Sequence, residues 1–358
     1  MRYILITVLL LFVCTGCGKT DKIDYTKRGI AWHDKGDYDK AIEDFDEAIR
    51  LDPTSAISYN YRGFALSAKG EYDKAIEDFD EAIRLDPTNA AACNNRGLAW
   101  SGKGEYDKAI RDYNKAVRID PKLAAAFNNR GFALSSSKGE HDKAIKDYNE
   151  AVRLDPTFAA AFNNRGLAWG YKGEYDKAIK DYNEAVRLDP KLVAAFNNRG
   201  LALSSKGEHD KAIKDYNEAV RLDPKHSAAY GNRGLAWGYK GEYDKAIKDY
   251  NEAIRLDPTY AEAIVNLAWL MATCPEAKYR DGAMAVKHAA KACELTTWKK
   301  AGFIGTLAAA YAETGDFTEA IKRLEQAMEL AAEDEKAVFQ FVLTLYKQGK
   351  PVRTNPKK

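Results

Sequence analysis

The chain has 358 residues, of which 46% are hydrophobic and 30% are charged. Lysine and arginine number 55 and aspartate and glutamate 53, so the formal net charge is only +2. So small an excess of positive charge gives no reason to expect a nucleic acid or an anionic membrane surface as the partner.

The first residues have the pattern of a secretory signal. Arg2 precedes an apolar run from Ile4 to Val13, and small residues follow as far as Cys17. The run is too short to span a bilayer of ~30 Å as a helix, but it fits the short apolar region of an export signal. The segment resembles a bacterial lipoprotein signal. That resemblance implies cleavage after residue 16, a lipid on Cys17, and anchoring on the extracytoplasmic side, at the outer membrane of a cell with two membranes. The alternative is an ordinary cleaved signal.

Seven similar blocks follow in residues 22–258, and each ends at a proline. These prolines are 34 residues apart, with a single interval of 35: Pro53, Pro87, Pro121, Pro156, Pro190, Pro224 and Pro258. In period and in residue pattern (residues 160–190 are A-A-F-N-N-R-G-L-A-W-G-Y-K-G-E-Y-D-K-A-I-K-D-Y-N-E-A-V-R-L-D-P) the blocks resemble the tetratricopeptide repeat. The resemblance implies an all-α, right-handed superhelical solenoid of helix-turn-helix units, and arrays of this kind hold partners and rarely perform chemistry.

Each block is expected to form two helices. In one block, residues 124–136 predict helix A, a turn with Gly139 follows, and residues 142–154 predict helix B, which Asp155-Pro156 ends. A glycine inside a helix costs up to ~1 kcal/mol relative to alanine. The recurrence of one at the place of Gly131 therefore predicts that helices A and B cross closely there.

An arginine on helix A and an aspartate on helix B recur together in the seven blocks. We predict an ion pair between the helices in each block, partly buried, which fixes their packing; the alternative is that the arginines bind a ligand. The arginines are Arg28, Arg62, Arg96, Arg130, Arg165, Arg199 and Arg233, and the aspartates are Asp44, Asp78, Asp112, Asp147, Asp181, Asp215 and Asp249.

On the opposite side of helix A, a recurring asparagine is expected to line a concave groove. The members of this set are Asn95, Asn129, Asn164, Asn198, Asn232 and Asn266. An amide both donates and accepts hydrogen bonds, so such a ladder can bind the backbone of an extended peptide. The alternative is that these amides bind only adjacent repeats or water. A second ladder, at Asn60, Asn94, Asn128, Asn163 and Asn197, is expected to bridge repeats.

Apolar side chains are expected to point into the same groove and to contact a partner. They are Leu98, Phe132, Leu167, Leu201 and Leu235, with Tyr171 and Tyr239 at its rim. An exposed apolar strip of this length indicates a partner surface. We therefore expect a non-enzymatic scaffold that binds an extended segment of another protein, for envelope assembly or secretion. Two alternatives are a receptor for a glycan or a small ligand and an accessory subunit that presents a substrate to a separate enzyme.

After Pro258 the pattern becomes irregular. We predict a degenerate repeat with a long loop between its helices, a ninth unit, a capping helix that covers the exposed end of the array, and a disordered tail. The boundaries expected along the whole chain are a signal at 1–16, a linker at 17–21, seven repeats at 22–258, the degenerate repeat at 259–296, the ninth unit at 297–332, the cap at 333–349 and the tail at 350–358.

The sequence lacks the spacings typical of enzymes and metal sites. Its five histidines form no H-x-x-x-H or H-E-x-x-H pattern, and its five cysteines no metal-ligand spacing. No nucleophile elbow, phosphate loop or dinucleotide fingerprint occurs. We predict no catalytic residue, no metal and no cofactor, and we expect no disulfide between Cys274 and Cys293.

Overall fold

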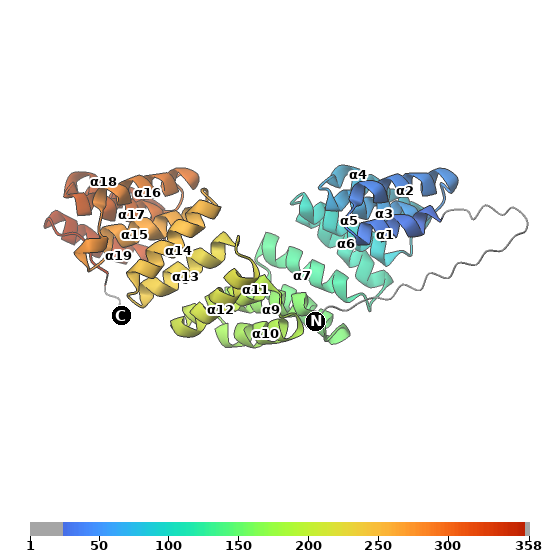
Figure 1. Cartoon of the computed structure of the whole chain (residues 1–358), viewed down its shortest axis with the longest axis horizontal. Helices are drawn as coiled ribbons and strands as arrows, with labels where there is room; N and C mark the ends of the chain where they lie inside the picture. Colours follow the sequence, from blue (N-terminus) through green and yellow to red (C-terminus); the bar gives the residue numbers. More distant parts are fainter. Residues whose placement is uncertain (1–23, 355–358) are drawn as a thin grey trace, which may run out of the picture. The chain divides into compact units, whose positions relative to one another are not determined.

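The computed structural model describes residues 24–354. The predicted signal and Cys17, the linker at 17–21 and residues 355–358 lie outside this range. Between residues 24 and 354 the chain forms nineteen α-helices and one short 3-10 turn, with no strand (Figure 1). The expected all-α class is therefore confirmed for this range. None of its helices is both long and apolar enough to cross a bilayer.

The first fourteen helices form seven hairpins. The first helices of the hairpins are α1 (Tyr25–Asp34), α3 (Ala56–Ala68), α5 (Ala90–Gly102), α7 (Ala124–Lys138), α9 (Ala159–Tyr171), α11 (Val193–Ser205) and α13 (Ser227–Tyr239). The second helices are α2 (Tyr38–Leu51), α4 (Tyr72–Leu85), α6 (Tyr106–Ile119), α8 (His141–Leu154), α10 (Tyr175–Leu188), α12 (His209–Leu222) and α14 (Tyr243–Leu256). A second helix also packs on the first helix of the next hairpin, as α10 does on α11.

The chain divides into two compact units. The first is Met1–Asn129 and the second is Arg130–Lys358, so the boundary falls inside α7. α7 has 15 residues, whereas α9 has 13. The single 35-residue interval between prolines falls in the same block. The first unit contains α1 to α6, and the second unit contains α8 to α19.

Close crossing of the two helices depends on the recurring glycine of helix A. A Cβ atom added to Gly166 would lie 2.7 Å from the ring of Tyr182, and one added to Gly200 would lie 2.6 Å from the ring of Tyr216. Real Cβ atoms do not approach a neighbour so closely. The aromatic side chains themselves are fully buried, with Tyr216 only 1% exposed. Each hairpin is therefore held by an aromatic ring against a bare stretch of helix backbone.

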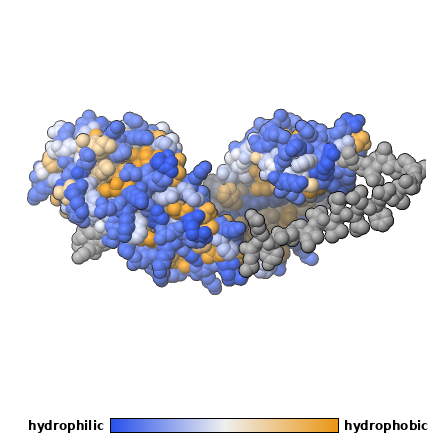
Figure 2. All heavy atoms as spheres, in the orientation of Figure 1, coloured by the Kyte–Doolittle hydropathy of each residue, from blue (hydrophilic) through white to orange (hydrophobic). Residues whose placement is uncertain are grey.

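The C-terminal part of the second unit continues the pairing with less regular elements. These are α15 (Ala261–Thr273), the 3-10 turn Ala277–Tyr279, α16 (Gly282–Leu295), α17 (Ala301–Thr314), α18 (Phe317–Leu330) and α19 (Glu333–Lys347). α15 pairs with α16, and α17 with α18. α19 packs on α18, where Leu343 and Tyr346 join a buried cluster with Leu324. Figure 2 shows hydrophobic surface gathered over the C-terminal helices, among mainly hydrophilic side chains.

The segment after α19 differs from the expected disordered tail. Residues 350–354, which we call the C-terminal strap, run back to the end of α15. The backbone N–H of Thr354 donates to the carbonyl of Thr273 at 2.9 Å, and the guanidinium of Arg353 lies 2.6 Å from a carboxylate oxygen of Glu313. The expectation of disorder therefore does not hold for residues 350–354, because backbone and ionic contacts fix them.

Candidate partner-binding surface

The apolar groove residues predicted from the sequence do lie at the surface of helices A. Phe132, Leu201 and Leu98 are 44%, 41% and 38% exposed, while Leu167 and Leu235 are half-buried. We call these five residues the groove stripe. An isolated exposed leucine needs no explanation, but a row at one repeated position does.

Two more members of this row were missed. Phe64 in α3 is 38% exposed and Trp269 in α15 is 37% exposed. Trp269 stands three residues after Asn266, as Leu201 stands three residues after Asn198, so the spacing alone could have identified it. The row therefore extends into the degenerate repeat.

The asparagines are largely engaged with one another. The Nδ2 of Asn198 donates to the Oδ1 of Asn163 at 3.1 Å, and that of Asn232 donates to the Oδ1 of Asn197 at 2.9 Å. The same bond joins Asn95 to Asn60 and Asn129 to Asn94 in the first unit. These bonds connect one repeat with the next.

The bridging role expected of the second ladder is therefore seen for Asn60, Asn94, Asn163 and Asn197. The groove amides take part in the same bonds, but these bonds do not use all of their hydrogen-bonding groups. An asparagine amide has two N–H donors and an oxygen with two lone pairs. Asn198 and Asn232, both half-buried, each use one donor in the bond between repeats, which leaves a second N–H for a partner.

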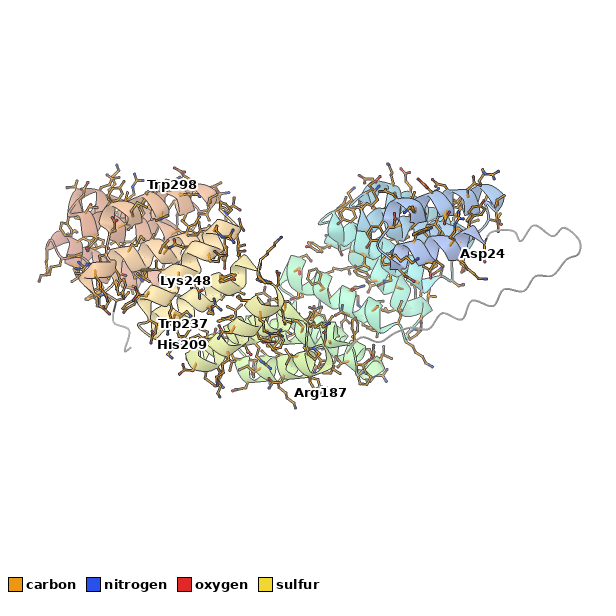
Figure 3. All side chains as sticks on the ribbon, viewed as in Figure 1. Asp24, Arg187, His209, Trp237, Lys248 and Trp298 are labelled. Atoms are coloured by element: carbon orange, nitrogen blue, oxygen red, sulfur yellow. The ribbon has the colours of Figure 1, made fainter. Side chains whose placement is uncertain are left out.

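The rim tyrosines have a specific local environment. Tyr171 stacks on the ring of His141, with centroids 4.9 Å apart, and Tyr239 stacks on His209 at 4.8 Å. The third member of each group is a serine, since Ser135 hydrogen-bonds the Nδ1 of His141 and Ser204 hydrogen-bonds that of His209. Figure 3 labels His209 at the start of α12. Tyr171 remains 64% exposed and Tyr239 53% exposed, so one side of each ring is available.

His141 and His209 stand where the other regular blocks have a tyrosine. The smaller histidine ring leaves space for the ring of the rim tyrosine, Tyr171 or Tyr239, to stack on it. Where Tyr72 stands instead, the residue 30 positions later is Gly102, and a Cβ there would lie 2.6 Å from the tyrosine ring. The sequence shows the same rule. The residue 30 positions after His141 or His209 is a tyrosine, whereas the residue 30 positions after a tyrosine is small: Ala68, Gly102, Ser136 and Ser205.

Two cavities of the second unit are lined by the predicted groove residues. One, of about 360 Å³, has Phe132, Asn164, Leu167 and Tyr171 in its wall. The other, of about 640 Å³, has Leu235, Tyr239 and Asn266 in its wall, together with Trp269. Both volumes lie in the range of roughly 300–1,000 Å³ that is typical of ligand pockets. The structure thus brings amide, apolar and rim residues together at two places.

The seven arginines form the ion pairs expected of them. In each pair Nε and Nη2 of the arginine bond both oxygens of the aspartate at 2.5–2.8 Å. The sequence did not reveal a further contact. The Nη1 of Arg62 also bonds Asp46 of the preceding hairpin at 2.6 Å, and that of Arg165 bonds Asn149 at 2.9 Å. The arginines therefore connect neighbouring hairpins as well as the two helices of one hairpin.

Burial in the packed core changes the pKa values of several titratable groups. Burial raises the pKa of Tyr113 to about 12 and that of the Cys293 thiol to about 11, so both stay neutral at physiological pH. Cys93, Cys274 and Cys293 are buried free thiols. Within residues 24–354 no group of three or more histidine, cysteine or acidic side chains is placed to hold a metal ion.

Family models agree with this architecture. A tetratricopeptide repeat model matches residues 56–89, 193–226 and 227–260, and another matches residues 305–338. A TPR repeat model matches residues 29–70, 102–137, 136–169 and 171–207. The chain belongs to the tetratricopeptide repeat proteins. Proteins built from these repeats are in general non-catalytic scaffolds for protein–protein interaction, since stacked repeats offer an extended binding surface.

Solved structures show the same repeat fold. The Cut9–Hcn1 hetero-tetramer of the APC/C contains a chain 18% identical to this one, with a TM-score of 0.65; the match covers 81% of this chain and 57% of that one. PilF of Pseudomonas aeruginosa is 20% identical with a TM-score of 0.52, over 58% of this chain and 94% of that one. A tetratricopeptide repeat protein from Parabacteroides merdae is 20% identical with a TM-score of 0.51, over 65% of this chain and 92% of that one. No curated protein matches the chain by sequence.

Proposed function

We propose that the chain is a scaffold that binds an extended segment of a partner protein along the groove stripe of its second unit. The observation that carries this proposal is that both described cavities are lined by groove residues, Phe132 and Leu167 in one and Leu235 in the other. An apolar strip with unused amide hydrogens beside it suits a polypeptide, whose side chains alternate with donor and acceptor groups of its backbone.

The affinity of such a surface comes from many weak contacts. Each repeat offers one apolar side chain and, at positions such as Asn198 and Asn232, one remaining amide donor. A segment that orders on binding loses conformational entropy, which lowers the affinity for each unit of buried area. Contacts repeated along several hairpins offset that loss, because each later contact forms within an already associated complex.

Site-specific photo-crosslinking tests the proposal. A benzoylphenylalanine in place of Tyr171, which is 64% exposed, is expected to crosslink a discrete partner in cells. The matched control replaces Lys143, whose side chain is 69% exposed on α8, and is expected to give no such product. The double variant Phe132→Asp, Leu201→Asp is expected to abolish the product made from position 171. Crosslinks from position 143 alone would contradict the proposal, because they would place the partner on the outer helices.

The proposal includes a place in the cell. The apolar run ending near Cys17 supports export and a lipid anchor on the extracytoplasmic side, where a scaffold would serve envelope assembly or secretion. Cys17→Ala is expected to leave the protein unlipidated, with mass spectrometry of the purified N-terminus as the measurement. An unmodified Cys17 in the wild-type chain would contradict this part of the proposal and leave the groove unaffected.

A further inference from the structure

The larger cavity of the second unit has features that the groove stripe does not explain. Its walls come from α13, α14, α15, α17, α18, α19 and the C-terminal strap, and we call it the C-terminal cavity. Most of its lining is apolar, and the rings in its wall are Tyr239, Tyr243, Tyr250, Trp269, Phe303, Phe339 and Tyr346. Glu335, which is exposed, is the one charged residue among the described residues that line it.

A glycine in the cavity wall has no packing partner. A Cβ added to Gly302 in α17 would meet no atom within 4 Å, in contrast to Gly200, where it would lie 2.6 Å from Tyr216. Glycine in a helix costs up to ~1 kcal/mol relative to alanine. Five regular repeats have alanine at this position: Ala91, Ala125, Ala160, Ala194 and Ala228. Gly302 therefore enlarges the cavity without improving the packing of the chain itself.

The asparagine in the cavity wall has lost the partner that its counterparts have. Asn232 donates to Asn197, the residue 35 positions earlier. The residue 35 positions before Asn266 is Gly231, and the ring of Tyr260 occupies the space beside it, 2.8 Å from an added Cβ. No side-chain hydrogen bond joins Asn266 to another of the described residues. Its amide therefore presents both its donors and its oxygen at the half-buried wall of the cavity.

We propose that the C-terminal cavity is the anchor site for a bulky apolar side chain of the bound segment, while Asn266 bonds the peptide group beside it. This inference rests on the proposed function. A free primary amide can donate to a peptide carbonyl and accept from the neighbouring N–H at the same time. Leu235 and Tyr239 belong to both the groove and the cavity wall, so a segment in the groove leads into the cavity.

The negative charge beside the cavity favours basic residues on either side of the anchoring residue in the bound segment. Glu335 stands in the first turn of α19, which also contains Glu333 and Asp334. No cation lines the cavity among the described residues. A segment with lysine or arginine next to its phenylalanine or leucine is therefore favoured over one with acidic flanks.

Peptides of defined sequence test the inference. The probes are fluorescein-labelled eleven-residue peptides of serine and glycine with a central Phe-Leu pair, flanked by lysine in one peptide and by glutamate in the other. A third peptide keeps the lysines and replaces Phe-Leu by Ser-Ser. Fluorescence anisotropy with residues 18–358 is expected to show binding of the lysine-flanked Phe-Leu peptide, at least tenfold weaker binding of the glutamate-flanked peptide, and no binding of the third peptide.

Substitutions locate the site. Gly302→Leu places a side chain in the cavity at a position where a Cβ meets no atom within 4 Å, and it is expected to weaken binding of the lysine-flanked peptide at least tenfold. Gly170→Leu is the matched control, because a Cβ there also meets no atom within 4 Å and Gly170 lines neither cavity; its affinity is expected to equal that of the wild type. Asn266→Ala is expected to weaken binding about five- to tenfold. Circular dichroism checks that each variant is folded.

The outcomes separate this inference from the proposed function. Binding that survives Gly302→Leu but is lost in Phe132→Asp, Leu201→Asp would overturn the anchor site and leave the groove supported. Absence of binding by the wild type up to millimolar peptide would also overturn the anchor site. Failure of the proposed function would appear instead as the absence of crosslinks from position 171 in cells.

Discussion

Arg199 donates two parallel hydrogen bonds to Asp215, from Nε to Oδ2 at 2.8 Å and from Nη2 to Oδ1 at 2.6 Å. Its Nη1 donates a third, at 2.8 Å, to Asn183 of the preceding hairpin. The arginine side chain is 18% exposed and that of Asp215 is 9% exposed. One guanidinium group therefore fixes both the crossing of α11 with α12 and the stacking of two hairpins.

Removal of one partner of this pair should be costly. Arg199→Ala leaves the Asp215 carboxylate buried without its counter-charge, so we expect the free energy of unfolding of this region to fall by about 3–5 kcal/mol. Hydrogen exchange of the α11 and α12 amides measures the effect locally, which suits an array whose repeats need not unfold together. The double variant Arg199→Leu, Asp215→Leu should recover most of the loss. A cost below about 1 kcal/mol for Arg199→Ala would contradict a buried, structural role.

The helical glycines should respond to alanine in opposite directions. At Gly200 the added Cβ would lie 2.6 Å from Tyr216, so Gly200→Ala is expected to destabilise the chain by about 1–3 kcal/mol. At Gly170 the added Cβ meets no atom within 4 Å, so Gly170→Ala is expected to stabilise it by about 0.4–1 kcal/mol. Thermal unfolding monitored by circular dichroism compares the two. Equal shifts would show that close helix crossing is not what requires Gly200.

Buried tyrosines should make the protein sensitive to alkali. Burial raises the pKa of Tyr113 to about 12, and it also raises the pKa of Tyr148 above the ordinary value of 10.0. Between about pH 10 and 12 the unfolded chain releases phenolic protons that the folded chain keeps. The free energy of unfolding therefore falls as the pH rises, and the contribution of these groups is fully present only below about pH 10.

Tyr148→Phe isolates this effect. Phe45 and Phe79 stand at the equivalent position in the first two hairpins, so the substitution should cost less than ~1 kcal/mol at neutral pH. Its melting temperature should fall less than that of the wild type between pH 8 and pH 11. The same decline in both proteins would mean that Tyr148 does not contribute to the alkaline transition.

The C-terminal strap should stabilise the degenerate repeat. Deletion of residues 350–358 removes the bonds of Thr354 to the Thr273 carbonyl and the ion pair of Arg353 with Glu313. We expect faster hydrogen exchange at the end of α15 and no change in α8 to α12. Glu313→Gln in the full chain is a milder control, since it keeps the backbone bond of the strap. Unchanged exchange in α15 would show that the strap adds no stability there.

The regular repeats could be predicted because the seven blocks serve as comparisons for one another. Proline and glycine positions indicated where helices end, and the recurrence of Arg199 with Asp215 indicated a pair that one isolated block would not have shown. The predicted groove residues are also brought together, with Phe132, Leu167 and Tyr171 in one cavity wall. Repetition supplies the information here that an isolated sequence lacks.

The features that were missed depend on contacts between blocks or on blocks that do not repeat. The third hydrogen bond of Arg199 reaches Asn183 in the preceding hairpin, and the strap meets α15 across 81 residues. The free amide of Asn266 follows from a substitution in another repeat, where Gly231 replaces an asparagine. Such effects require knowledge of which side chains face each other, and the period of the sequence does not provide it.

The pairing of His141 with Tyr171, and of Tyr72 with the bare backbone of Gly102, restricts how the array can change in length. A block whose helix A ends in a rim tyrosine needs a histidine 30 residues earlier, at the start of helix B in the preceding block. A tyrosine there leaves no room, because even a Cβ at residue 102 would lie 2.6 Å from the ring of Tyr72. Loss of the block that contains Ser205 and His209 would therefore set Tyr239 against Tyr175. In the early blocks, where Ala68, Gly102 and Ser136 follow tyrosines, the loss of one block creates no such junction. The rim tyrosines thus restrict changes of length only in the second unit.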